Sequence, residues 1–366
     1  MDPLASMEGL SPAEALRRGR WVKLIAGASN QDLAAIEDLA GIYALAGVHC
    51  LDMAADPAVI AAARRGLAWA EETRGAPFGP ARPWLMVSLS DGSDPHFRKA
   101  WFDPRRCPAD CPRPCQRVCP ALAIAAPEQG GAVIAERCYG CGRCLPVCPL
   151  GLIEEREQWL APGAVPPLLA ELAPDAVELH TRLGRSEAFA ARLEQVLLAG
   201  VPLQRLAVSC GLARDGRGPA PTPRALAAEL DDRAAQLERA GLLPLWQLDG
   251  RPMSGDVGAG TAHAAVRLLQ AVASLAPPGP LQLAGGTNHH TLELVERLGP
   301  LTGQAAGVAF GGVARSRLQP WLLAAQERGL RLLEARDLVP GALAQARELV
   351  GPWLRRSLPT PGTARG

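Results

Sequence analysis

The feature that most constrains this chain is a cysteine-rich segment: eight of the ten cysteines fall in two blocks of four, and each block closes with a Cys-Pro pair. The second block has the spacing C-x2-C-x2-C-x3-C-P of bacterial ferredoxins, in which three thiolates bind one [4Fe–4S] cluster and the fourth reaches its neighbour. We therefore predict iron–sulfur ligation, with a two-site zinc module as the alternative. The candidate ligands are Cys107, Cys111, Cys115, Cys119, Cys138, Cys141, Cys144 and Cys148.

An internal repeat supports a two-cluster arrangement, because residues 119–124 (CPALAI) resemble residues 148–153 (CPLGLI). In a two-cluster ferredoxin each half supplies three ligands to one cluster and one ligand to the other. This rule assigns Cys138, Cys141, Cys144 and Cys119 to one [4Fe–4S] cluster, and Cys107, Cys111, Cys115 and Cys148 to a second. The first block has three-residue inner gaps and several prolines, so the second cluster could be [4Fe–4S] or [3Fe–4S].

Composition excludes several classes of protein. The formal net charge is +1 and no basic stripe is visible, which argues against nucleic-acid binding. The sequence contains no run of about 18 uncharged apolar residues, so we expect no membrane span. The N-terminus lacks the pattern of a signal peptide. The cysteine spacing is that of metal ligands and not of a secreted disulfide framework. We therefore expect a cytoplasmic protein.

Outside the cysteine segment, strand-like and helical patterns alternate. Eight strand–helix units predict a (β/α)8 barrel of the TIM type, and an open doubly wound sheet is the alternative. The expected parts are 1–92 (first three strands), 93–155 (a two-cluster, ferredoxin-like insertion after strand three), 156–345 (strands four to eight) and 346–366 (a C-terminal tail). The expected strands are 21–28, 48–53, 84–90, 176–181, 206–210, 243–249, 280–284 and 307–310.

The barrel hypothesis gives meaning to paired glycines after the last two strands, because phosphate sites often lie there. Glycines let backbone amides approach an anion closely, so a flavin or another phosphorylated ligand is conceivable; tight barrel turns are the alternative. The candidate residues are Gly285, Gly286, Thr287, Asn288, Gly311 and Gly312. The two remaining cysteines, Cys50 and Cys210, lie in apolar strands and are expected to be buried core residues.

Several segments resemble one known family. They are residues 23–33 (KLIAGASNQDL), 46–57 (AGVHCLDMAADP), the cysteine segment, 248–256 (LDGRPMSGD) and 285–288 (GGTN). Together they are similar to the cyanobacterial light-dependent period (LdpA) family over most of the chain. The resemblance implies an iron–sulfur protein that reports cellular redox state to the circadian clock, with clock input and oscillator proteins as partners. No catalytic residue carries over from the family.

These observations lead to one functional hypothesis and two alternatives. The first is an iron–sulfur redox sensor that responds to photosynthetic electron flow, directly or through quinones, and modulates the clock period. No convincing nucleophile–base pair or carboxylate pair supports catalysis. The alternatives are a flavin-dependent oxidoreductase, in which the clusters pass electrons to a cofactor at the barrel mouth, and a ligand-binding barrel with structural clusters.

Overall fold

The computed structural model describes residues 9–157, 160–212, 221–251 and 258–357. Eight parallel strands close into a barrel in the order β1-β10-β9-β8-β7-β6-β3-β2, which confirms the predicted (β/α)8 architecture. The strands are β1 (Trp21–Gly27), β2 (Cys50–Ala54), β3 (Trp84–Ser90), β6 (Ala176–His180), β7 (Arg205–Cys210), β8 (Pro244–Asp249), β9 (Leu281–Ala284) and β10 (Ala305–Phe310).

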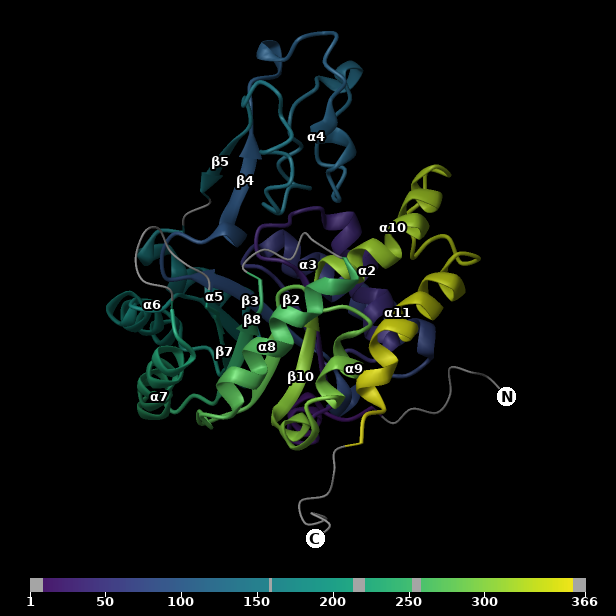
Figure 1. Ribbon diagram of the computed structural model, residues 1–366. Helices are drawn as coiled ribbons and strands as arrows, with labels where there is room; N and C mark the ends of the chain where they lie inside the picture. Colours follow the sequence, from purple (N-terminus) through teal and green to yellow (C-terminus); the bar gives the residue numbers. More distant parts are fainter. Residues whose placement is uncertain (1–8, 158–159, 213–220, 252–257, 358–366) are drawn as a thin grey trace.

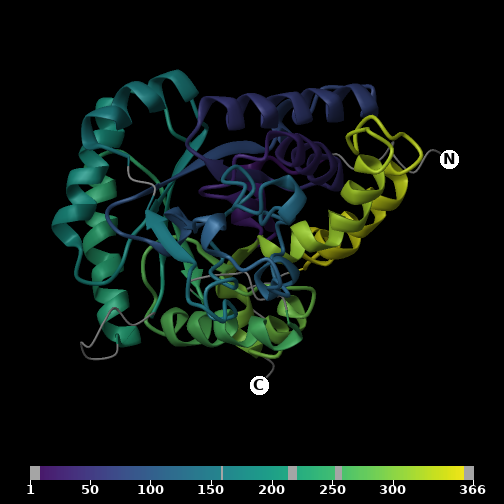
Figure 2. The same ribbon diagram turned by 90° about the horizontal axis from the view of Figure 1, so that it is seen from above.

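Helices surround the barrel and bury their apolar faces against it (Figure 2). They are α1 (Pro12–Arg17), α2 (Leu33–Ala46), α3 (Pro57–Arg74), α5 (Val165–Leu172), α6 (Ser186–Leu198), α7 (Pro223–Arg239), α8 (Ala262–Ala273), α9 (Thr291–Glu296), α10 (Gly312–Gln326) and α11 (Val339–Leu354). Local signals fix several of their ends. Asp56 caps α3 by accepting from two backbone amides, Pro57 occupies its first turn, and Gly75 ends it in a left-handed conformation.

Residues 346–354, which the sequence analysis assigned to a tail, form the second half of α11. This helix packs against α2 and α10 and buries Ala346, Leu349 and Trp353. The Gly351-Pro352 pair obscured its helical period in the sequence, yet the helix continues to Leu354. Helix α11 therefore completes the layer of helices beside β1.

The cysteine segment lies between β3 and β6 and projects beyond the barrel end where these strands finish (Figure 1). Its neck is an antiparallel pair, β4 (Arg98–Trp101) and β5 (Glu154–Glu157). It also contains a short helix, α4 (Pro114–Arg117), and a bridge between Ile124 and Val133. The view along the barrel axis shows this segment above the barrel opening (Figure 2). We call residues 98–157 the cysteine module.

The barrel interior has an apolar part and a polar part. Trp21, Cys50, Trp84 and Met86 belong to a buried apolar cluster that also includes Leu245. Further along the strands, toward the module, the buried side chains are polar and include Lys23, Asp52, Glu178 and Gln247. Cys50 and Cys210 are both buried in apolar clusters, as predicted. Among the described residues, no helix is both long and apolar enough to cross a bilayer.

Candidate functional site

The internal repeat of the module produces two equivalent turns. After Cys119 and after Cys148, the third residue on adopts a positive φ, +50° at Leu122 and +59° at Gly151. In each turn the following backbone N–H points to the cysteine sulfur, at 3.3 Å for Cys119 and 3.4 Å for Cys148. Amide donors of this kind stabilise a thiolate and tune an iron–sulfur centre. The two Cys-Pro segments therefore form matched turns, each with a backbone N–H donated to its cysteine sulfur.

Four of the cysteines line one pocket in the module. Cys119 comes from the first block, and Cys138, Cys141 and Cys144 come from the second. Burial raises the pKa of Cys144 to about 12, and the neighbouring thiols add to this effect. Buried thiolates this close together repel one another, so they need a metal to stay deprotonated. The structure thus gathers the four residues that the ferredoxin rule assigns to one cluster.

Members of the predicted second set also lie together. Cys107, Cys115 and Cys148 belong to an apolar cluster with Phe102 and Ile153, which also includes Cys119 and Cys144 of the first set. Burial raises the pKa of Cys115, and the thiols of Cys148 and Cys107 raise it further. Cys111 lies in the same loop, and its N–H donates to the carbonyl of Pro108 at 3.1 Å. Three members of the predicted second set are therefore neighbours, and the fourth is close to them in sequence.

The spacing of the sulfurs bears on the choice of metal. A tetrahedral zinc ion with Zn–S bonds of about 2.3 Å holds its sulfurs about 3.8 Å apart. Among the described residues, the one group of three or more potential ligands whose atoms all lie within 4.8 Å contains no cysteine. No three sulfurs of the described cysteines therefore lie within 4.8 Å of one another. Four cysteine thiolates lining one pocket are the donor set of an iron–sulfur cluster.

The module is attached to the barrel at the turn that follows β1. Lys99 on β4 donates to the side-chain oxygen of Gln31 and to the carbonyl of Ala135, both at 2.7 Å. The backbone N–H of Gln31 donates to the carbonyl of Glu136 at 2.8 Å. These bonds join the start of α2 to the loop that carries Cys138.

A second connection runs from α10 to the residue after Cys138. The guanidinium carbon of Arg315 lies 4.1 Å from the ring centroid of Tyr139, a cation–π contact. The same guanidinium donates to the carbonyl of Ala26 at the end of β1. Burial raises the pKa of Tyr139 to about 12, so its phenol stays neutral. Tyr139 is thus enclosed between the barrel and the pocket that Cys119, Cys138, Cys141 and Cys144 line.

Beneath Tyr139 the barrel mouth contains a buried ionic network. The Lys23 ammonium lies 2.8 Å from Oδ2 of Asp52 and also contacts Glu178, and Lys23 and Glu178 are 0 % exposed. Burial opposes the charge on Lys23, but the two carboxylates hold its pKa above the usual value. Gln247 donates to Glu178 at 2.7 Å, and Ser88 donates to Asp52 at 2.8 Å. Each buried charge therefore has several partners.

At the rim of this network His180, the last residue of β6, contacts Glu178 through Nε2 at 3.1 Å. Burial alone would lower the pKa of His180, but the bond to Glu178 raises it to about 9. Asp249 at the end of β8 accepts a hydrogen bond from Ser209, and burial raises its pKa to about 6. One pocket opens toward Tyr139. It is lined by Asp52, Ser88, Glu178, His180, Gln247 and Asp249.

The sequence analysis did not single out Lys23, Asp52, Glu178 or His180 as site residues. A signal was available, because strands buried on both faces normally consist of apolar residues. Lys23, Asp52 and Glu178 interrupt three such strands. Their side chains meet only after closure brings β1, β2 and β6 around one axis, which a single sequence does not reveal.

The predicted glycine site is only partly assembled. Gly285, Gly311 and Gly312 line the barrel-mouth pocket. Gly286, Thr287 and Asn288 do not line it: Gly286 accepts from Thr261, Thr287 donates to the carbonyl of Ala309, and Asn288 donates to that of Gly258. A Cβ on Gly285 would lie 2.4 Å from the carbonyl oxygen of Arg251, so close packing already explains this glycine. Residues 252–256 of the segment 248–256 (LDGRPMSGD) lie outside the described residues.

Comparisons with known proteins agree with the module and the barrel. The chain is 49% identical over 353 residues to "Light dependent period A" of Synechococcus elongatus, with 94% of each chain covered. Residues 107–159 match the family described as LdpA Fe-S cluster-binding domain, and residues 168–352 match Light dependent period A C-terminal domain.

Similarity to solved structures is remote. Type I 3-dehydroquinate dehydratase from Clostridium difficile is 8% identical, with a TM-score of 0.36 over 83% of this chain and 86% of that chain. Geranylgeranylglyceryl phosphate synthase from Thermoplasma acidophilum is 12% identical, with a TM-score of 0.38 over 93% and 99%. Neither bears on chemistry. The match to an Fe-S cluster-binding domain and the gathered cysteines show that this chain is an iron–sulfur protein. The sequence comparisons show that it belongs to the light-dependent period A family.

Proposed function

We propose that this protein is a cytoplasmic redox sensor with two iron–sulfur clusters, which relays photosynthetic redox state to the circadian clock. The observation that carries the proposal is the gathering of Cys119 with Cys138, Cys141 and Cys144 in one pocket beside the barrel mouth. These four residues would hold a [4Fe–4S] cluster. Cys107, Cys111, Cys115 and Cys148 would hold the second cluster, [4Fe–4S] or [3Fe–4S].

The chain's own residues supply a route from the clusters to the barrel. Bound clusters would exchange single electrons with a donor or a quinone. A change of charge or ligation near Cys138 would act on the next residue, Tyr139, and on the Arg315 guanidinium that faces its ring. It would also act on the loop held by Lys99 and Gln31. Both contacts end on the β1–α2 region of the barrel, which we propose as the responsive surface.

The clock role rests on the relative's name, "Light dependent period A". Clock input or oscillator proteins would be the partners. A sensor transmits only the difference in affinity between its two states. We therefore expect at least a tenfold difference in partner affinity between oxidised and reduced protein, which corresponds to about 1.4 kcal/mol.

The first test is a redox titration of anaerobically purified protein, followed by electron paramagnetic resonance and visible absorption. We expect two reversible cluster signals. Cys141→Ala should remove one signal and leave the barrel folded, whereas Cys210→Ala, at a buried cysteine of β7, should keep both. A colourless protein loaded with zinc would refute the proposal. Stoichiometric flavin absorbance would instead support the oxidoreductase alternative.

The second test measures binding of the organism's oscillator and input proteins to the oxidised and the reduced protein by anaerobic biolayer interferometry. Cys141→Ala should lose the redox dependence, and Cys210→Ala should retain it. Equal affinities in both redox states, together with intact and reversible clusters, would rule out the sensor role and leave an electron-transfer role.

A further inference from the structure

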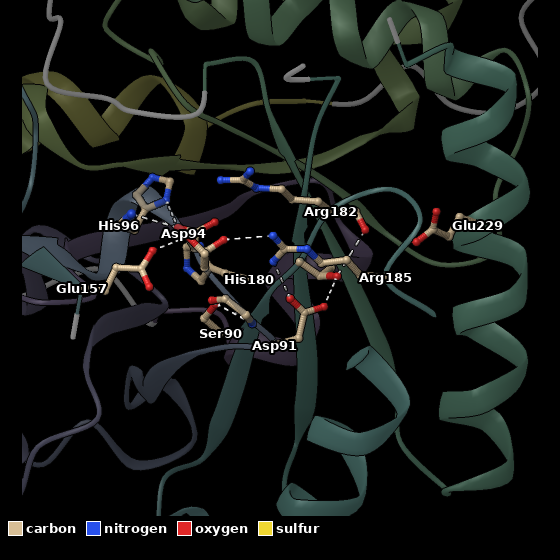
Figure 3. Close-up of polar contacts among 12 residues, drawn as sticks. Ser90, Asp91, Asp94, His96, Glu157, His180, Arg182, Arg185 and Glu229 are labelled. Carbon is tan, nitrogen blue, oxygen red and sulfur yellow. Dashed lines mark hydrogen bonds and ion pairs between the residues drawn. The ribbon is translucent and has the colours of Figure 1, made fainter. Parts of the chain in front are cut away.

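Three potential metal ligands meet at the base of the neck. Asp94 and His96 belong to the segment between β3 and β4, and His180 ends β6. One ligand atom from each lies within 4.8 Å of the other two. Figure 3 shows the two imidazole rings beside the Asp94 carboxylate. None of these residues belongs to the cysteine module's ligand set.

The distances suit a divalent transition metal. Nδ1 of His96 lies 2.8 Å from Oδ1 of Asp94, and Nδ1 of His180 lies 3.9 Å from the same oxygen. Bonds of about 2.0–2.1 Å to nitrogen and oxygen put neighbouring ligand atoms about 2.8–3.4 Å apart. The Asp94–His96 pair, here joined by a hydrogen bond, already has this separation, and the Asp94–His180 pair needs a movement of about half an ångström. The third pair, His96–His180, lies within 4.8 Å.

His180 provides an independent indication of a missing ligand. Its side chain is 7% exposed, and its Nδ1 atom is buried without a hydrogen-bond partner. Its other ring nitrogen, Nε2, contacts Glu178 at 3.1 Å. A histidine that binds a metal through one nitrogen almost always donates the other N–H to a carboxylate, carbonyl or water. His180 therefore has the partner that orients such a ligand and lacks an occupant on the opposite side of the ring.

Charge also favours a cation here. Asp52 and Glu178 share the Lys23 ammonium. Two further carboxylates lie near these imidazoles and are not paired with Lys23: Asp94 contacts both histidines, and Asp249 lines the same pocket as they do. A buried site with excess negative charge is stabilised by a bound cation.

From these observations we infer a mononuclear binding site for a divalent transition metal such as Zn²⁺ or Fe²⁺, formed by Asp94, His96 and His180. Two histidines and one carboxylate suit these ions, and three protein ligands leave positions open for water or a small oxygen ligand. His96 and His180 both line the barrel-mouth pocket, so the open positions would face it. Bound metal would also fasten the neck of the module to the end of β6.

The experiment uses full-length, anaerobically purified protein with its native iron content, and zinc as the probe. Zinc affinity is measured by competition with a chelator, and coordination by X-ray absorption at the zinc edge, which does not detect cluster iron. We expect one tightly bound zinc per chain with nitrogen and oxygen neighbours at about 2.0–2.1 Å. His96→Ala should weaken zinc binding at least tenfold, as should Asp94→Asn, whose amide oxygen can still accept from the His96 N–H.

His290→Ala is the matched control. His289 and His290 are also adjacent histidines, with ring centroids 3.9 Å apart, and they lie outside the proposed site. Visible absorption and circular dichroism identify variants that remain folded, and the two ligand variants provide separate readings. The inference is overturned if zinc affinity is unchanged in both ligand variants. It is also overturned if sulfur neighbours appear at about 2.3 Å, which would place zinc on the cysteines, or if His290→Ala abolishes binding.

Discussion

Replacing Lys23 by methionine tests whether the barrel-mouth network stabilises the fold through its central cation. The change keeps a long unbranched side chain and removes the ammonium that Asp52 and Glu178 share. Removing one partner of a buried ion pair usually costs about 3–5 kcal/mol. Glu178 keeps Gln247 and His180 as partners, and Asp52 keeps Ser88, so we expect a loss of about 3–4 kcal/mol.

The assay is an anaerobic urea titration, with the barrel followed by near-ultraviolet circular dichroism and the module by visible absorption. With a slope of about 3 kcal/mol per molar, the midpoint should fall by about 1 M. Lys23→Met combined with Asp52→Asn should cost less than the sum of the single changes, since the double variant leaves one fewer uncompensated carboxylate. A midpoint within about 0.2 M of the wild type would refute the argument.

Three further predictions concern the barrel base, the module and their contact. Burial lowers the pKa of His49 to about 4 from an unfolded value of about 6.5. The unfolded chain therefore takes up a proton first, so the free energy of unfolding should be at its full value above pH 6.5 and should fall as the pH drops toward 4. The loss by pH 5 should be about 2 kcal/mol, and urea midpoints of His49→Asn should show a smaller acid effect. Gly140→Ala places a Cβ 2.1 Å from a neck carbonyl and should abolish cluster absorption, whereas Gly130→Ala, also at positive φ but in open space, should retain it. Arg315→Leu removes a positive charge beside the pocket of Cys119, Cys138, Cys141 and Cys144, and a redox titration should show a lower reduction potential for the cluster held there. Arg317→Leu, on the same helix, is the control. Equal shifts in the two variants would contradict a specific contact.

Much of the barrel could be predicted because its strands are short apolar runs between recognisable caps. The expected strand 84–90 coincides with β3, and the expected strand 176–181 differs from β6 by one residue. These boundaries depend on local chemistry, such as Asp56-Pro57 before α3. The neck strands gave no such signal, because Glu154–Glu157 is charged and exposed along its whole length.

For the candidate site, too, the sequence predicted some residues and missed others. Cysteine spacing predicted the candidate ligands of the module, because ferredoxin-type cysteine ligands recur at short, fixed intervals along the chain. His180 and Asp94 could not be paired from the sequence, since they meet only through the barrel and the neck. The glycine prediction was incomplete for a related reason: Asn288 and Thr287 bond to backbone groups far away in the sequence.

The paired neck also affects how the chain folds. About 85 residues separate the end of β3 from the start of β6, and these strands must pair for the barrel to close. Pairing β4 with β5 first reduces the loop to be closed to about 25 residues, which lowers the entropic barrier by about 1 kcal/mol. Barrel closure should therefore be several times faster when the module assembles first. Iron supply during synthesis would then influence the yield of folded barrel as well as the occupancy of the module.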